Sequence, residues 1–254
     1  MNIKFSVITV VYNASKVLEQ TLLSIINQTY NNIEYIIIDG GSTDGTTDLI
    51  KQYQSCLFYW VSEPDKGIYD AMNKGLREAT GDYVWFLNAG DTLQHHNIVL
   101  ELAVIAEQAE LPDVLYGETD LMDMEGCVFA KRRLKAPSNL TWKSFRMGML
   151  VCHQAFIVKR SIAPEYDLQY RFSADFDWCI RCLKEAEKAN GKVIHSNLRL
   201  VNYLYEGTTT ANRKASLKER YAIMCRYYGT LSTQIWHMWF VIRFYWAKFT
   251  NRAI

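Results

Sequence analysis

The sequence has no glycine before Gly40, and it lacks the GxGxxG and GK[ST] loops that two common nucleotide-binding motifs require. This argues against a dinucleotide-dependent oxidoreductase and against a P-loop nucleotidase. There is no HExxH pattern and no spaced set of cysteines and histidines, so no zinc site is expected. No apolar run reaches the ~20 residues of a membrane span. Residues 1–11 are followed by no small-residue cleavage site, so we expect no secretory signal.

Neither sign of charge is in excess, because 28 lysines and arginines stand against 27 aspartates and glutamates in 254 residues. A net charge of +1 gives no general attraction for nucleic acid, so no nucleic-acid partner is expected. Six cysteines are scattered over the chain, which favours reduced thiols and a cytoplasmic protein over a disulfide framework. Cys179 and Cys182 have CxxC spacing without a second pair, and we expect both to be packed core thiols.

What the sequence does contain is a regular alternation of strand-like and helix-like segments over its first 90 or so residues. Short β-branched or apolar runs are typical of strands buried on both faces, and they occur at residues 3–11, 33–38, 57–61 and 83–87. Apolar residues at helical spacing separate these runs. The pattern predicts an α/β fold with a mainly parallel sheet flanked by helices. A later helix is expected at about residues 174–189.

Polar clusters stand where each of the four predicted strands ends, at Tyr12-Asn13, Asp39–Asp44, Glu63–Gly67 and Asn88–Asp91. In open α/β sheets ligands bind at the carboxyl ends of the strands, so the clusters predict one shared binding site. An ionised Asp39 at the end of a buried strand is costly unless it is paired. The N–H edge of uracil or guanine would satisfy it, and so would the backbone N–H groups of the turn that follows.

Asp91 also has two interpretations. A carboxylate at the end of the fourth strand can bind Mg²⁺ or Mn²⁺ that bridges a diphosphate, since hard cations favour oxygen ligands. The alternative is that Asp91 caps the helix expected after His95.

The C-terminal segment is rich in aromatic residues, which are Trp236, Trp239, Phe240, Phe244, Tyr245, Trp246 and Phe249. This composition is typical of a helix packed on the body of the protein or on a second subunit. It is equally typical of a helix lying in the plane of a membrane interface, where tryptophan and basic residues are favoured.

Three stretches together resemble the donor half of the family 2 glycosyltransferases, which share the GT-A fold: SVITVVYNA, IEYIIIDGGSTDGT and SEPDKGIYDAMNKGLREATGDYVWFLNAGD. The likeness is nearest to the bacterial exopolysaccharide and colanic-acid type. It is dense over residues 3–95, thinner over 150–210 and weak or absent beyond 211. It implies a GT-A domain at 1–210, with a nucleotide-sugar half at 1–120 and an acceptor half at 121–210. A helical, aromatic-rich tail at 211–254 would follow.

The resemblance implies roles at matching positions. Residues that bind the nucleotide sugar would be Thr9, Val11, Asn13, Asp39, Ser42, Asp44, Asp65, Lys66, Gly67, Asp70 and Asn88. Residues 88–91 stand where the family carries a metal-binding Asp-x-Asp element, with Asn88 and Gly90 in place of the usual acids. Asp91 would therefore be the main protein ligand of Mn²⁺ or Mg²⁺.

His153 and Gln154 resemble the acceptor side of the family's site, and Ser173–Asp177 resembles its catalytic-base segment. Ala174 replaces the first of two usual acids, so Asp175 is the expected base and is preferred to Asp177. The structural alternative for Asp175 is a plain helix N-cap.

The expected activity is the inverting transfer of a hexosyl group from a UDP- or GDP-linked sugar to a hydroxyl of a saccharide or lipid-linked saccharide. It would serve surface-polysaccharide assembly in the cytoplasm, or at the inner face of the cytoplasmic membrane. One alternative is a non-catalytic subunit that binds the nucleotide sugar or acts as a scaffold. A nucleotidyltransferase would need a glycine-rich basic loop after the first strand, and the sequence has none.

Overall fold

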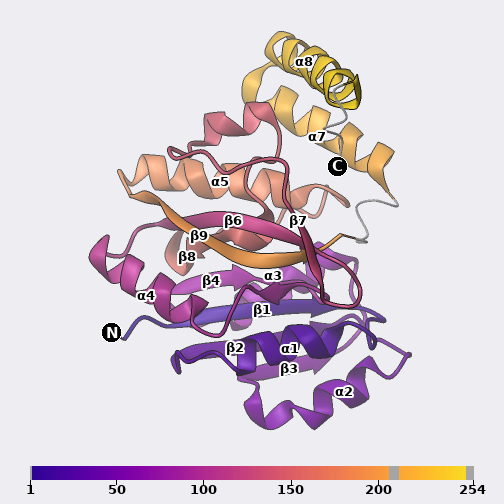
Figure 1. Cartoon of the computed structure of the whole chain (residues 1–254), viewed down its shortest axis with the longest axis vertical. Coiled ribbons are helices and arrows are strands. Elements are labelled where there is room, and N and C mark those ends of the chain that lie inside the picture. Colours follow the sequence, from indigo (N-terminus) through magenta and orange to yellow (C-terminus); the bar gives the residue numbers. More distant parts are fainter. Residues whose placement is uncertain (1, 206–211, 250–254) are drawn as a thin grey trace.

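The computed structural model describes residues 2–205 and 212–249, and their strands form one nine-stranded sheet (Figure 1). The strands are β1 (Phe5–Val11), β2 (Ile33–Asp39), β3 (Tyr59–Ser62), β4 (Tyr83–Phe86), β5 (Thr92–Leu93), β6 (Val114–Met122), β7 (Val128–Lys131), β8 (Phe156–Lys159) and β9 (Val193–Leu204). The α-helices are α1 (Leu18–Ile26), α2 (Thr46–Gln52), α3 (Ile68–Glu78), α4 (Ile98–Gln108), α5 (Ala174–Lys188), α7 (Arg213–Tyr228) and α8 (Thr230–Phe249). Short 3₁₀ helices are η1 (Gln54–Cys56), η2 (Trp142–Met147), η3 (His153–Ala155) and η4 (Arg160–Ile162).

The predicted α/β fold with a mainly parallel sheet in its first half is confirmed. The strand order is β3-β2-β1-β4-β8-β6-β9-β5, and β7 pairs with β6. The first four strands of this order are parallel neighbours, whereas β8 runs antiparallel to both β4 and β6. Strand β6 spans the predicted boundary at residue 120, so one sheet runs through the donor and acceptor halves.

Helices cover both faces of the sheet, which explains why β1 reads as a continuous apolar run. Successive side chains of a strand point to opposite faces. Ile8 and Val10 pack with α3, α5 and α7 in one core cluster, and Val7 and Val11 pack with α1, α2 and α4 in the other. Helix α3 lies close to the sheet at Gly75, where an added Cβ would be 2.4 Å from Ile8 Cγ2.

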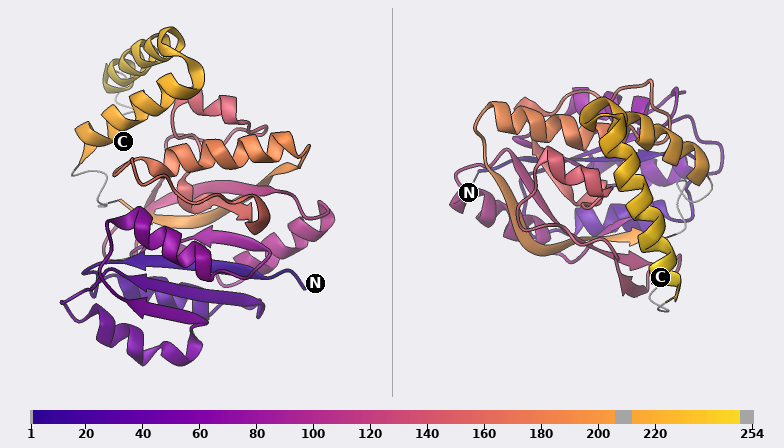
Figure 2. Two further views of the ribbon diagram at one scale, coloured as in Figure 1. Left: turned by 180° about the vertical axis from the view of Figure 1, so that it is seen from behind. Right: turned by 90° about the horizontal axis from the view of Figure 1, so that it is seen from above.

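Helices α7 and α8 lie at one end of the molecule, and β2, β3 and α2 lie at the other (Figures 1 and 2). In α8, the half-buried Trp236 and Phe240 pack against the body. The side chains of Phe244, Tyr245, Trp246 and Phe249 lie outside the described part of the chain. Among the described residues, no helix is long and apolar enough to cross a bilayer.

All six cysteines are free thiols, as expected for reduced cysteines. Cys179 and Cys182 are fully buried in α5, and burial raises the pKa of both thiols well above the usual value. The expectation that this pair packs in the core is confirmed.

Candidate functional site

The loops that follow the first strands of the sheet meet at one edge, as their positions at the ends of parallel strands predict. The backbone N–H of Asn13 donates to Ser42 Oγ at 2.7 Å, and Asn13 Oδ1 accepts from the N–H of Thr43 at 2.9 Å. The loop after β3 lies against the loop after β2 at Gly40, where an added Cβ would be 2.4 Å from Asp65 Oδ2. Gly40 is therefore a glycine because the two loops approach too closely for a side chain.

Asp39 is completely buried, and its carboxylate is satisfied by its own chain. Oδ2 accepts from the backbone N–H groups of Gly41 at 3.1 Å and Ser42 at 2.9 Å. The hydroxyls of Ser42 and Ser62 donate to the two oxygens as well. The structure therefore agrees with one of the two predicted interpretations, in which the backbone N–H groups of the turn donate to the Asp39 carboxylate. A contact with a nucleotide base stays a prediction.

Three other predicted residues lie in or beside this loop. Asp44 Oδ1 accepts from the N–H and hydroxyl of Thr46, and these hydrogen bonds, that from the hydroxyl foremost, lower the pKa of Asp44 and keep it ionised. Thr9 is fully buried, with its hydroxyl 3.2 Å from the Tyr35 hydroxyl, so its side chain points into the body of the protein. The carbonyl of Val11 accepts from the N–H of Gly40 at 2.9 Å.

The loop after β3 is shaped by its own acids. Asp65 Oδ1 accepts from the N–H of Gly67 at 2.7 Å, and Asp70 Oδ2 accepts from the N–H of Lys66 at 3.0 Å. Gly67 has φ +118, a left-handed conformation that favours glycine, and it immediately precedes α3. Both carboxylates therefore hold the turn from which α3 begins, and the side chain of Lys66 is exposed.

The segment after β4 differs from an Asp-x-Asp element for a steric reason. Gly90 has φ +98, which favours glycine, and an added Cβ would lie 2.6 Å from Leu204 Cδ2, so an acidic residue there would strain the backbone and displace the Leu204 side chain. Asn88 is half-buried, and its Oδ1 is buried without a hydrogen-bond partner among the described residues. That oxygen is an acceptor whose hydrogen-bonding capacity is unused in the described part of the chain.

Asp91 is only 3% exposed, and both carboxylate oxygens are engaged. Oδ1 accepts from the N–H of Leu204 and Oδ2 accepts from Gln154 Nε2, each at 2.8 Å. Burial raises the pKa of Asp91 to about 7. It is not the cap of the next helix, because the N-cap of α4 is Asn97.

This environment does not fit a resident metal ion. A metal ligand must present an accessible oxygen, and both oxygens of Asp91 are buried and already accept hydrogen bonds. Within residues 2–205 and 212–249, no group of three or more histidine, cysteine, aspartate or glutamate side chains could hold a metal.

His153 and Gln154 form η3 and are both buried, at 4% and 5% exposure. His153 Nε2 is 2.6 Å from the Tyr166 hydroxyl, and burial lowers the pKa of its imidazole. The carbonyl of Gln154 accepts from Trp85 Nε1 at 2.6 Å. These two residues therefore support the site from within the core.

Asp175 lies in the first turn of α5 and is half-buried. Its Oδ1 accepts from the Tyr69 hydroxyl at 3.0 Å. The N-cap of α5 is Ser173, whose hydroxyl is bonded to Ser216. Asp175 is therefore not a plain N-cap, and its accessible carboxylate suits a proton acceptor.

Asp177 has a different environment two residues further along the same helix. It is completely buried, and its carboxylate accepts hydrogen bonds from Arg181 Nε at 2.6 Å and from the Tyr227 hydroxyl at 2.8 Å. A buried, doubly paired carboxylate has a structural role, which supports the choice of Asp175 over Asp177.

Sequence reasoning missed Tyr69, which lies on α3 directly after the Asp65–Gly67 turn. Its ring stacks on Tyr166 at 5.5 Å between centroids, and Tyr166 is the partner of His153. Tyr69 and Asp175 are 106 residues apart in sequence, so no local pattern could have joined them.

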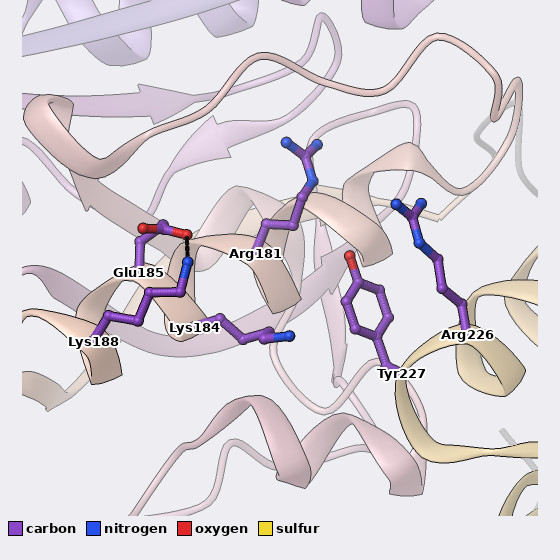
Figure 3. Close-up of a pocket in the computed structure, with 6 residues that line it drawn as sticks. All are labelled: Arg181, Lys184, Glu185, Lys188, Arg226 and Tyr227. Carbon is purple, nitrogen blue, oxygen red and sulfur yellow. Dashed lines mark hydrogen bonds and ion pairs between the residues drawn. The ribbon is translucent and has the colours of Figure 1, made fainter.

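A separate pocket of about 350 Å³ lies between α5 and α7 and contains none of the predicted site residues (Figure 3). Its basic side chains already have partners: Lys188 pairs with Glu185 at 2.6 Å, and Lys184 Nζ lies 5.3 Å and 5.2 Å from the ring centroids of Trp142 and Tyr227. The remaining lining residues are Arg181 and Arg226. We therefore place the candidate site at the strand ends and Asp175.

Comparison with known proteins identifies the family of the chain. The model of the family described as "Glycosyl transferase family 2" matches residues 6–148. The chain belongs to glycosyltransferase family 2. One family relative, the PGL/p-HBAD biosynthesis glycosyltransferase of Mycobacterium bovis (strain BCG / Pasteur 1173P2), is 34% identical over 188 residues, which are 70% of this chain and 69% of the relative.

Solved structures agree with the GT-A fold expected of this family 2 member. S. aureus TarS (residues 1–349) in complex with UDP superposes with a TM-score of 0.68 at 17% identity, covering 87% of this chain and 65% of that one. The complex of the same TarS fragment with UDP-GlcNAc also has a TM-score of 0.68, at 19% identity, covering 87% and 64%. The chain thus spans less than two thirds of those structures, and the likeness establishes the fold.

We predict that Asp91 makes stability fall as pH rises. Its pKa is raised from 3.8 to about 7 in the folded protein, so the folded state holds the proton more tightly than the unfolded state. Its contribution is fully present below pH ~4 and is lost by pH ~7, a loss of roughly 2–4 kcal/mol. In chemical denaturation, Asp91→Asn should flatten the pH dependence over this range. Equal slopes for the two proteins would contradict the assignment.

Proposed function

We propose that the protein transfers a hexosyl group from a UDP- or GDP-linked sugar to a hydroxyl of a saccharide or lipid-linked saccharide, with inversion. The observation that carries the proposal is the 3.0 Å hydrogen bond between Tyr69 and Asp175. It links an accessible carboxylate of the acceptor half to α3, which begins at the donor-side loop of Asp65–Gly67. A proton acceptor is thereby fixed beside the place where the strand-end loops would hold a donor.

The proposed reaction is a single displacement. Asp175 takes the proton of the acceptor hydroxyl as its oxygen forms a bond to the anomeric carbon. The bond from that carbon to the phosphate oxygen breaks on the opposite face, and the nucleoside diphosphate leaves with the electron pair. The nucleotide would lie along the loops of Asn13 and Asp39–Asp44, with the diphosphate toward Asp65–Asp70 and Asn88. The TarS complexes with UDP and UDP-GlcNAc favour a uridine nucleotide.

The biological setting that we propose is surface-polysaccharide assembly of the exopolysaccharide or colanic-acid type, in the cytoplasm and at the inner face of its membrane. One face of α8 supports the membrane contact. Apolar side chains that are at least half exposed recur there at helical spacing: Leu231, Ile235, Met238, Trp239 and Ile242. No charged residue occurs from 230 to 242, yet residues 212–254 hold eight bases and one acid. This combination suits an anionic lipid surface.

A second candidate is a subunit that binds a nucleotide sugar without turning it over. The saturated Asp91 and the glycine at position 90 favour it, because acids in this element assist transfer in other members of the family. The accessible carboxylate of Asp175 favours transfer, since a binding subunit would have no use for a base. Nucleotide binding without turnover would favour the binding subunit.

We predict that Asp175→Asn abolishes transfer while leaving nucleotide affinity nearly unchanged. The amide cannot accept the proton, so kcat should fall about 10²-fold or more. Radiolabelled sugar transfer and calorimetric titration with UDP measure the two quantities. Asp177→Asn is the matched control on the same helix. It should lower the melting temperature through its buried ion pair and leave the kcat of the folded fraction largely intact. Substantial transfer by Asp175→Asn would exclude Asp175 as the base.

Divalent-metal dependence stays a prediction, and the mechanism above contains no metal step. An ion carried in by the diphosphate would require Asp91 to release a hydrogen-bond partner. Titration of UDP and GDP into the wild-type protein and Asp91→Ala, with and without Mn²⁺, tests this. Metal-dependent binding that Asp91→Ala weakens would establish Asp91 as a ligand. Metal-independent binding of equal strength in both proteins would contradict that role.

We predict that the wild-type protein co-sediments with vesicles containing phosphatidylglycerol, and that the double variant Ile235→Glu/Trp239→Glu does not. Charges on the apolar face cannot enter the acyl boundary. Leu168→Glu is the control, because Leu168 is 50% exposed elsewhere on the surface. Unchanged sedimentation of the double variant would contradict the contact. A wild-type dimer in light scattering that the double variant breaks would assign the face to a second copy instead.

A further inference from the structure

Helix α7 is hydrogen-bonded to residues 171–173, the segment just before Asp175, the proposed base. Glu219 accepts the backbone N–H groups of Arg171 at 2.9 Å and Phe172 at 2.8 Å. One turn earlier, the hydroxyl of Ser216 is 2.9 Å from that of Ser173, the N-cap of α5. Helix α7 therefore fixes the segment immediately before Asp175, although it lies outside the residues that match the family model.

The next residue of α7, Arg220, extends toward the same place. Its guanidinium carbon lies 5.9 Å from the ring centroid of Phe176, the neighbour of Asp175. Its positive charge also acts on the Tyr69 hydroxyl, where it partly offsets the burial and the Asp175 charge that raise the pKa of Tyr69. Arg220 is thus within electrostatic range of the Tyr69–Asp175 pair.

The guanidinium has unused binding capacity. Its Nε is buried and has no hydrogen-bond partner within the described residues. The adjacent acid, Glu219, is occupied by two backbone N–H groups. Burying a donor without a partner is costly, and the planar guanidinium of arginine matches the geometry of phosphate oxygens. An anion at this position would remove the cost.

We propose that Arg220 is a phosphate-binding residue of the active site, supplied by α7. The inference rests on the proposed function, which brings a diphosphate to this site. The ligand is the diphosphate of the donor, or that of a lipid-linked acceptor bound beside the base. In the first case the N–H groups of Arg220 stabilise the charge that develops as the nucleoside diphosphate departs. The saturated Asp91 gives this role weight, because Asp91 offers no open oxygen for a metal that would otherwise offset that charge.

The test is calorimetric titration of wild type, Arg220→Gln and Arg220→Lys with UDP, GDP and farnesyl diphosphate. Lys218→Gln is the matched control, since Lys218 is exposed two residues earlier on α7. We expect Arg220→Gln to weaken one of the diphosphates at least about tenfold, Arg220→Lys to weaken it less, and Lys218→Gln to leave it unchanged. Circular dichroism confirms that each variant is folded.

The titrations with different diphosphates distinguish the two possible ligands. Weaker binding of UDP or GDP assigns Arg220 to the donor, and weaker binding of farnesyl diphosphate assigns it to a lipid-linked acceptor. Equal affinity of the wild type and a folded Arg220→Gln for every probe would overturn the inference alone. A wild-type protein that binds none of the three probes would overturn the proposed function together with the inference.

Discussion

The hydrogen bond from Tyr69 to Asp175 joins the two halves of the site, and the account of catalysis depends on it. Tyr69 lies on α3, which begins directly after the Asp65–Gly67 turn, whereas Asp175 lies on α5. Gly75 allows α3 to pack closely on β1. Glu219 and Ser216 of α7 form hydrogen bonds with the segment just before Asp175. The distance between Asp175 and the loop proposed to hold the donor is therefore set by packed elements.

Most acids at the strand ends have an architectural use. Asp39 closes its own turn, Asp44 and Asp65 each accept from the backbone a few residues on, and Asp91 fixes the last residue of β9. For Asp39, Asp65 and Asp91 these hydrogen bonds offset the cost of partial or complete burial, whereas Asp44 is exposed. Fewer groups are left without such a use: Lys66 is exposed, the carboxylate of Asp175 is half-buried, and Asn88 Oδ1 and Arg220 Nε are buried without a hydrogen-bond partner among the described residues.

The sequence predicts the donor half well because its signals are local. Apolar runs identified β1 to β4 within about two residues, and the parallel order of these strands brings their polar ends together. It could not predict the burial of Asp91 between Gln154 and Leu204, because both partners are distant in sequence. Tyr69 and Arg220 could not be predicted for the same reason, because their contacts with Asp175 and Phe176 join residues that are distant in sequence. In α8, Trp236 packs inward and Trp239 is half exposed, and contact of the exposed side with a membrane stays a prediction.

The most direct test of the assembled site is a crystal structure of the protein with bound UDP. The account predicts that the uracil lies at the Asp39–Asp44 loop, with the diphosphate directed toward Asn88. The Asp175 carboxylate should face the space that the donor sugar would fill, on the side away from the β-phosphate. A nucleotide bound elsewhere, such as in the basic pocket between α5 and α7, would contradict the account. So would a nucleotide at the strand ends whose diphosphate points away from Asp175.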